Sequence, residues 1–358
     1  MFFAKFFIFK GIIMTATHYN QSELEDSINN LSTNLCNIST DEQLNFLQNS
    51  LTSLTNLQAG DPELSDMNLI QKAIDELVQS FLLFKDYRDT RKVTIFGSSR
   101  TEPKNPNYTL TEETAKQLVE SGMLVITGAG PGIMEAGNKG AGEGNSFGLH
   151  IILPFEQKPN EYIYNSEKMI PYNYFFTRKL IFVKESDAFV LFPGGFGTQD
   201  EAFEVLTLMQ TGRCSPRPFI IINHDNSTYW EEWKTYVHTH LLDKNYISPE
   251  DMNLIKILKS STEVASCINH FYSTYHSIRY IDKTTCIRLN SPLSEATVNQ
   301  LNDTFPHLLD SGRFELSDNT CFPKEESLYP DKQRLLFNFN HKSYGGLISL
   351  IDYINDNA

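Results

Sequence analysis

Apolar residues recur at intervals of three and four across residues 15–88, a spacing that predicts amphipathic helices. Thr40 is followed three residues later by Gln43, which resembles a capping box at the start of a helix. The apolar runs cover residues 24–35, 44–54 and 69–84. We expect an N-terminal helical region that is either a regulatory or oligomerisation element or a cap packed on the core.

From Lys92 onward, short apolar runs alternate with helical patterns. Continuously apolar strands that alternate with helices are typical of a parallel sheet covered on both faces. Strands are predicted at residues 93–96, 123–126, 148–153, 188–192, 219–222 and 255–258, and helices at 111–121, 132–142, 175–184, 202–209 and about 230–242. We therefore expect an α/β fold with a Rossmann-like, doubly wound parallel sheet over residues 89–275. Such sheets bind ligands outside the carboxyl ends of their strands, at a topological switch point.

The regular alternation weakens after Tyr275. Strands are predicted at residues 285–289 and 334–339, and a closing helix at 344–354, with proline-containing segments between them. These elements predict a small α+β appendage over residues 276–358. The sequence does not indicate what this region does.

Composition limits the classes of function. The 358 residues carry a formal charge of −14, whereas binding of a nucleic-acid polymer requires clustered Lys and Arg. A small phosphorylated ligand needs only local donors and stays compatible with this charge. The five cysteines form no Cys-x-x-Cys pair and the nine histidines show no paired spacing, so we expect reduced thiols and no metal site.

The first fourteen residues are strongly apolar but are interrupted by Lys5 and Lys10. They lack the cleavage site of a signal peptide and are too short to span a bilayer, so we interpret residues 1–14 as an over-extended start, with Met14 as the alternative initiator. No other segment approaches the length of a membrane span. We expect a soluble, cytoplasmic protein with no membrane partner.

Residues Pro193–Glu201 read Pro-Gly-Gly-Phe-Gly-Thr-Gln-Asp-Glu, between an apolar strand and an amphipathic run. Glycines allow backbone N–H groups to approach an anion closely, and a helix N-terminus adds positive partial charge. Thr198 adds a hydroxyl, and Glu201 places a carboxylate in the first turn of the helix. This pattern predicts a phosphate-binding loop with a carboxylate beside it.

Three further motifs follow predicted strands or precede one. Arg178-Lys179 lies on the helix before the glycine-rich loop, Gly128–Glu135 reads Gly-Ala-Gly-Pro-Gly-Ile-Met-Glu, and Gly97-Ser98-Ser99 follows the first strand. The four elements, in their order along residues 90–260, resemble the Lonely Guy family of nucleoside-monophosphate phosphoribohydrolases, often mislabelled as lysine decarboxylases. Ala129 stands where that family has the middle glycine.

The resemblance implies hydrolysis of a nucleoside 5'-monophosphate, such as AMP, GMP or a cytokinin riboside monophosphate, to a free base and ribose 5-phosphate. It implies no cofactor and a homodimer or higher homo-oligomer, and the terminal extensions resemble the longer bacterial members. Glu201 and Arg178 are the expected catalytic residues, stabilising an oxocarbenium-like state and binding phosphate or the departing base by a forked pair of hydrogen bonds. The expected substrate-binding residues are Gly97, Ser98, Gly128, Gly130, Gly132, Met134, Glu135, Lys179, Gly194, Gly195, Gly197 and Thr198.

Other interpretations stay open. A Glu in the first turn of a helix and a solvated Arg-Lys pair are both common, and a nucleotide sensor without turnover would use the same loop. A decarboxylase would need a Schiff-base lysine and a pyridoxal phosphate site, which no feature identifies. The dinucleotide fingerprint is poorly met, and no Gly-x-Ser-x-Gly elbow of an esterase is present. Phe155 and the aromatics of residues 172–176 either stack on a base or pack in the core.

Overall fold

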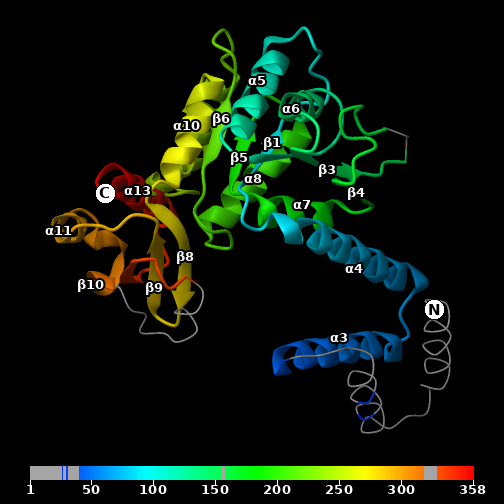
Figure 1. Ribbon diagram of the computed structural model, residues 1–358, viewed down its shortest axis with the longest axis horizontal. Coiled ribbons are helices and arrows are strands. Elements are labelled where there is room, and N and C mark those ends of the chain that lie inside the picture. Colours follow the sequence, from blue (N-terminus) through cyan, green and yellow to red (C-terminus); the bar gives the residue numbers. More distant parts are fainter. Residues whose placement is uncertain (1–25, 27–29, 31–39, 155–157, 318–328) are drawn as a thin grey trace. The chain divides into compact units, whose positions relative to one another are not determined.

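The computed structural model describes Asp26, Asn30 and residues 40–154, 158–317 and 329–358 (Figure 1). The chain forms two compact units, Met1–Ile74 and Asp75–Ala358. The predicted start at residues 1–14, nearly all of the first amphipathic run and Phe155 lie outside the described residues. Among those that are described, no helix is both long and apolar enough to cross a membrane.

The first unit contains α3 (Asp41–Ala59) and the beginning of α4 (Leu64–Phe84). Thr40 is the N-cap of α3, as predicted, and its hydroxyl oxygen accepts a hydrogen bond of 3.2 Å from the backbone N–H of Gln43. None of the 19 residues of α3 is buried. The end of α4 belongs to the second unit, where Glu76, Ser80 and Phe84 are buried.

The second unit is built on a seven-stranded sheet in which every paired strand is parallel. The strands are β1 (Lys92–Phe96), β2 (Leu124–Thr127), β3 (Ser146–Ile151), β4 (Met169–Tyr172), β5 (Ala188–Leu191), β6 (Phe219–Ile222) and β7 (Ile255–Leu258). Their order is β4-β3-β2-β1-β5-β6-β7. The chain therefore winds outward in both directions from β1 and β5, which confirms the doubly wound α/β fold and puts the switch point between those two strands.

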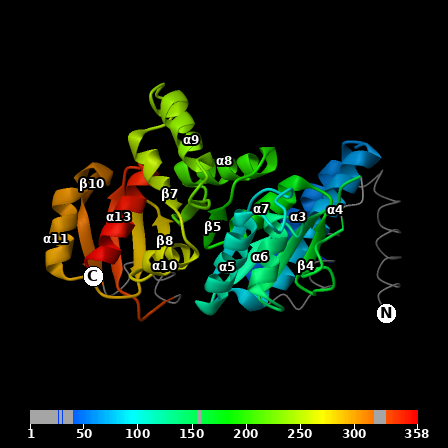
Figure 2. The ribbon, with the colours of Figure 1, turned by 90° about the horizontal axis from the view of Figure 1, so that it is seen from above.

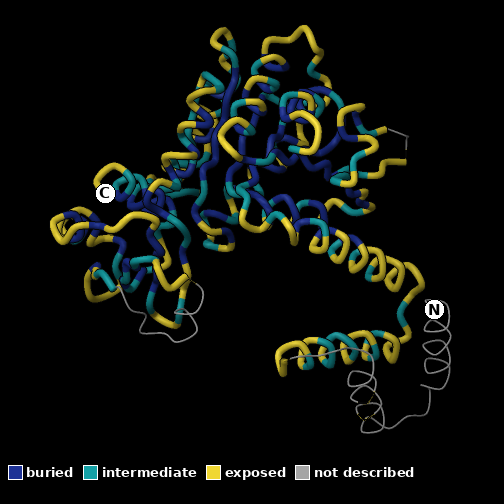
Figure 3. Tube along the Cα trace, in the orientation of Figure 1, coloured by how far each residue is buried: buried dark blue, intermediate teal, exposed yellow. Residues whose placement is uncertain are grey.

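Residues alternate between the two faces of this sheet, and each face has its own helices (Figure 2). Val93 and Ile95 of β1 pack on one side with α5 (Pro106–Glu120), α6 (Ile133–Ala141) and α10 (Ser261–Phe271). Phe96 of β1 and Phe189 of β5 pack on the other side with α7 (Phe175–Glu185), α8 (Phe196–Gln210) and α9 (Tyr229–Val237). Every residue of the predicted strands β1, β5 and β6 is thus buried, as expected for a sheet covered on both faces (Figure 3).

The C-terminal residues form a four-stranded antiparallel sheet, as the α+β interpretation anticipated. Its order is β10-β11-β9-β8, from β8 (Tyr275–Ile281), β9 (Thr284–Leu289), β10 (Leu309–Ser317) and β11 (Arg334–Phe339), with α11 (Glu295–Thr304) and α13 (Tyr344–Asp356) alongside. Short helical turns are Lys85–Tyr87, His238–Leu242, Pro249–Leu254 and Pro306–Leu308. The sequence reading did not include β4, β8, β10, α10 or α11.

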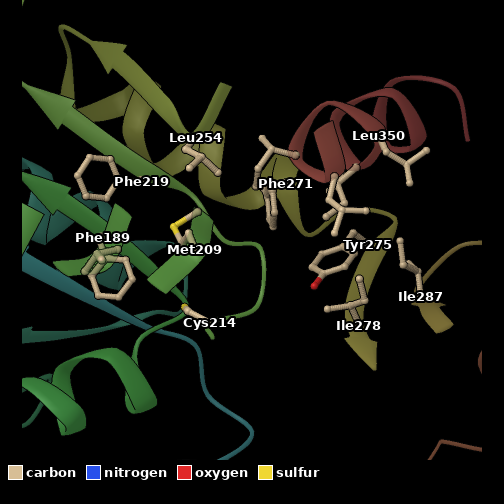
Figure 4. Packing of buried hydrophobic residues seen from close by; sticks show 14 of the residues in the cluster. Phe189, Met209, Cys214, Phe219, Leu254, Phe271, Tyr275, Ile278, Ile287 and Leu350 are labelled. Atoms are coloured by element: carbon tan, nitrogen blue, oxygen red, sulfur yellow. The ribbon is translucent and has the colours of Figure 1, made fainter. Parts of the chain in front are cut away.

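One continuous apolar core joins the two sheets (Figure 4). Phe219 and Met209 lie at the parallel sheet, Phe271 lies between the sheets, and Tyr275 and Leu350 lie in the C-terminal region. All five side chains are at most 2% exposed. The C-terminal region therefore shares its core with the parallel sheet.

Candidate functional site

The loops that follow β1, β2 and β5 meet at the switch point. The backbone N–H of Ser98 donates to the carbonyl of Pro193 at 3.1 Å, and the N–H of Ile133 donates to the carbonyl of Ser98 at 3.1 Å. These two hydrogen bonds link the Gly97-Ser98-Ser99 turn to both other glycine-rich segments. Since the carboxyl ends of parallel strands share one edge, motifs far apart in sequence converge there.

A cavity of 810 Å³ opens at this edge. Of the residues expected at a site, Gly97, Ser98, Gly128, Met134, Arg178, Gly194, Gly195, Gly197, Thr198 and Glu201 line it. The others, Gly130, Gly132, Glu135 and Lys179, are not among its lining residues. Seven further residues complete the lining: Phe96, Ser99, Arg100, Phe175, Phe196, Gln199 and Asp200. Of these, the sequence had pointed only to Ser99, in the turn after the first strand, and to Phe175, in the aromatic run of residues 172–176.

The N-terminus of α8 faces the cavity with glycines on either side of Phe196. Gly195 is the N-cap and supplies no side-chain hydrogen bond to the helix. A Cβ built on Gly195 or Gly197 would have no atom within 4 Å. The first N–H groups of a helix lack intrahelical partners, so this open end offers donors and positive partial charge to an anion.

The glycine-rich loop is held in place by hydrogen-bonded side chains from α8 and α9. Tyr229 donates its hydroxyl to the carbonyl of Gly194 at 2.5 Å. Gln199 donates to the Tyr229 hydroxyl at 2.7 Å, and Trp233 donates its indole N–H to Gln199 at 2.8 Å. A Cβ at Gly194 would collide with the hydroxyl of Thr198, so only glycine allows the loop to pack this closely.

The loop after β2 takes an unusual backbone path. Ala129 has a φ of 59°, in the left-handed region that normally favours glycine. Gly132 also has a positive φ, of 69°. The N–H of Ala129 donates to Thr127 Oγ1, and its carbonyl accepts from the N–H of Asn160. Asn160 also donates to the carbonyl of Gly130 at 3.0 Å and to Asn138. This buried amide network stabilises a strained turn, and no local motif pointed to Asn160.

Arg178 is buried in the wall of the cavity, with an exposed fraction of 9%. Its Nε donates to the carbonyl of Leu149 at 2.7 Å, and its guanidinium lies where a Cβ on Gly128 would be. Burial lowers the pKa of Arg178, while the charges of Glu201 and Tyr172 oppose that shift. A guanidinium fixed in this way remains a charged, directional donor.

Glu201 is also buried, with an exposed fraction of 8%. Burial raises the pKa of Glu201, and the nearby Lys179 and Arg178 oppose that rise. Lys179 Nζ lies 3.4 Å from Glu201 Oε2, 3.1 Å from Asp200 Oδ2 and 2.5 Å from Glu204 Oε2. Burial lowers the pKa of Lys179, but these carboxylates outweigh it and the net shift is upward. Lys179 thus faces the acidic side of α8.

Two predicted positions have other surroundings. Glu135 accepts a hydrogen bond of 2.7 Å from the hydroxyl of Tyr108 on α5. Tyr172 is fully buried and shares a 2.6 Å hydrogen bond with Ser80, whereas Phe175 lines the cavity.

Arg100 brings a cation to the cavity, and no ion pair is formed by it within the described residues. Its position directly after the Gly97-Ser98-Ser99 turn was the available sequence signal.

Part of this chain is similar to known proteins. Residues 132–268 match the family described as possible lysine decarboxylase. Two cytokinin riboside 5'-monophosphate phosphoribohydrolases of Arabidopsis thaliana are similar to this chain. One is 24% identical over 185 residues, covering 51% of this chain and 84% of the relative. The other is 25% identical over 188 residues, covering 49% and 84%.

Solved structures with a similar arrangement include a molybdenum cofactor binding protein from Rippkaea orientalis and DNA processing protein A from Streptococcus pneumoniae. The first is 17% identical with a TM-score of 0.38, covering 50% of this chain and 96% of that one. The second is 12% identical with a TM-score of 0.36, covering 71% and 95%.

Proposed function

We propose that this chain, in which residues 132–268 match the family described as possible lysine decarboxylase, hydrolyses the N-glycosidic bond of nucleoside 5'-monophosphates. The products are a free base and ribose 5-phosphate, and the candidate substrates are AMP- or GMP-like nucleotides and cytokinin riboside monophosphates. The observation that carries the proposal is that Arg178, Glu201 and the glycine-rich start of α8 line the same cavity.

The phosphate end of the substrate belongs at the N-terminus of α8 in this proposal. Gly195 and Gly197 leave the space above the helix open, and the hydroxyl of Thr198 lies in the same wall. The guanidinium of Arg100 adds a full positive charge to the lining. Helix-end N–H groups together with a guanidinium suit a phosphate dianion, whereas a nucleoside without phosphate would leave them unpaired.

The bond-breaking step needs a negative group near the ribose. As the bond between C1' and the base breaks, its electron pair leaves with the base and positive charge develops on the ribose ring. The ionised Glu201 carboxylate stabilises this charge and orients the water that adds to C1', while the water proton passes to the products. Arg178 stabilises the electron pair on the departing base by donating hydrogen bonds.

The test is release of free base from AMP, GMP, IMP, CMP, UMP and isopentenyl-AMP, with the matching nucleosides as controls. We expect release from one or more monophosphates and none from nucleosides. Binding of a monophosphate without release would contradict hydrolysis and support a nucleotide sensor. Carbon dioxide release from lysine, measured in parallel, would instead support the decarboxylase that the family's description names.

We also propose that the chain forms a homodimer or higher homo-oligomer. Phe176 and Leu180 lie one turn apart on α7 and are 53% and 48% exposed, and Phe196 at the start of α8 is 96% exposed. Large apolar side chains grouped on two neighbouring helices suit contact with a second copy of the chain. Light scattering coupled to size exclusion tests this, and a monomer at micromolar concentration would contradict it.

A further inference from the structure

The carboxylate of Glu76 is buried against the start of helix α7. Glu76 lies on the part of α4 that belongs to the second unit, and only 4% of its surface is exposed. Its Oε1 accepts hydrogen bonds from the backbone N–H of Asn173 at 2.6 Å and from the Asn173 side chain at 3.0 Å. Its Oε2 accepts from the hydroxyl of Thr177. A carboxylate in an apolar interior requires such donors.

These contacts hold the start of α7, where the local sequence supplies no side-chain cap. Tyr174 is the N-cap of α7 and makes no side-chain capping hydrogen bond. Glu76 instead joins Asn173, just before the helix, to Thr177 in its first turn. A negative group at a helix N-terminus is favourable because the peptide dipoles place positive partial charge there. The carboxylate that makes these contacts comes from a residue about a hundred positions earlier in the chain.

The turn that Glu76 contacts leads directly into Arg178. Thr177 directly precedes Arg178. A contact that fixes Thr177 therefore also fixes how α7 is rotated, and how far it is shifted along its axis, at the residue that carries the guanidinium. Arg178 has little room for error, because its Nε must reach the carbonyl of Leu149 and its guanidinium lies against Gly128. Misplacement of a reacting group by about 1 Å is enough to cost about a hundredfold in rate.

We propose that Glu76 is a positioning residue for Arg178, acting through the first turn of α7. The inference rests on the proposed N-glycosidase function. Glu76 lies before residues 132–268, so the segment that matches the family does not include it. The N-terminal helical region thereby contributes one side chain to the geometry of the site.

The experiment compares Glu76→Ala and Glu76→Gln with Ser80→Ala in the full chain. Ser80 is a matched control, because it lies one turn further along α4, is fully buried and hydrogen-bonds Tyr172 rather than α7. For each variant we would measure kcat and KM for base release, the melting temperature, and hydrogen exchange of the amides in residues 173–178.

We expect Glu76→Ala to lower kcat by about tenfold to a hundredfold. KM should change by less than about threefold, because the phosphate site on α8 keeps its contacts. Amide exchange should accelerate in the first turn of α7. Glu76→Gln, which keeps an oxygen acceptor for Asn173, should restore part of kcat, and Ser80→Ala should keep kcat within about twofold even where it lowers the melting temperature.

Wild-type kcat in Glu76→Ala would overturn the proposal, as would unchanged exchange in α7. Equal losses of kcat in Glu76→Ala and Ser80→Ala, following the melting temperature, would reduce Glu76 to a general stabilising role. If the wild-type chain releases no base at all, the hydrolase proposal fails by itself. Amide exchange in residues 173–178 then judges Glu76 separately, with faster exchange expected in Glu76→Ala than in Ser80→Ala, and equal exchange in the two variants would overturn the positioning role.

Discussion

The ammonium group of Lys179 lies 3.4 Å from a carboxylate oxygen of Glu201. Arg178 and Lys179 are neighbours in the sequence, but their side chains have different surroundings. Arg178 lines the cavity, whereas Lys179 lies between the acidic side chains of α8. Its placement suits control of the charge on Glu201, while the expectation that Lys179 binds substrate directly remains a prediction that the next experiment addresses.

Replacing Lys179 by Met should move the acidic limb of the kcat/KM profile to higher pH. Burial raises the pKa of Glu201 and the charge of Lys179 opposes that rise. Without the ammonium group, Glu201 should take up its proton at a higher pH. Lys179→Arg, which keeps the charge, serves as the control. A large increase in KM with an unshifted profile would instead support direct substrate binding.

Glu201→Gln should abolish base release without lowering stability at neutral pH. The folded-state pKa of Glu201 is raised, so its contribution to stability is fully present below the ordinary carboxyl pKa and is lost as pH rises through the raised value. Gln resembles the protonated form and lacks that loss. Melting curves at pH 7 and AMP binding by calorimetry check this, with Glu204→Gln as the control expected to retain base release. Turnover by Glu201→Gln would exclude the proposed mechanism.

Two glycine substitutions should separate packing from ligand binding. Gly128→Ala places a methyl group onto the guanidinium of Arg178 and the sulfur of Met134, so both activity and melting temperature should fall. Gly197→Ala meets no atom within 4 Å and lies in a helix, where Ala is favoured by about 0.5–1 kcal/mol. It should keep or raise the melting temperature while weakening monophosphate binding. Unchanged binding in Gly197→Ala would place the phosphate elsewhere.

Arg100→Ala should weaken binding of monophosphates more than binding of nucleosides. The loss expected for a charge-assisted hydrogen bond to phosphate is about 1.5–3 kcal/mol, roughly tenfold to a hundredfold in Kd. Calorimetry with AMP and adenosine gives the ratio directly. Equal weakening of both ligands would indicate that Arg100 contacts the nucleoside part.

His276 in β8 should make the chain less stable in mild acid. Burial, followed by the charges of Lys332 and Arg288, lowers the pKa of His276 to about 4. In the unfolded chain a histidine has a pKa of about 6.5, so the unfolded state binds the proton more tightly. The stabilising contribution is therefore present above pH about 6.5 and is lost as pH falls toward 4. Melting temperatures from pH 7 to 4 should fall less steeply in His276→Gln, and parallel curves would contradict this.

Local sequence patterns were enough to predict a strand where its own residues are mostly apolar. The strands at residues 219–222, 255–258 and 334–339 were predicted with the bounds that the structure has, because apolar residues predominate in each. The edge strand β4 was missed, since Pro171 interrupts its pattern and β3 is its one partner in the sheet. Strand β10 was missed because polar Asp310, Ser311 and Gly312 occupy its exposed half.

By itself the sequence determined the α/β alternation, the glycine-rich turns and the chemical groups that could serve a nucleotide, because each depends on residues close together in the chain. Only the tertiary structure decided that Arg178 faces the cavity while Lys179 faces Glu201, and that Asn160 and Glu76 hold the loops and helix that carry the site. Those contacts join buried polar groups from distant segments. A buried polar atom takes whichever partner the packing of the sheet and helices brings within reach, and that packing is not encoded in any short stretch of residues.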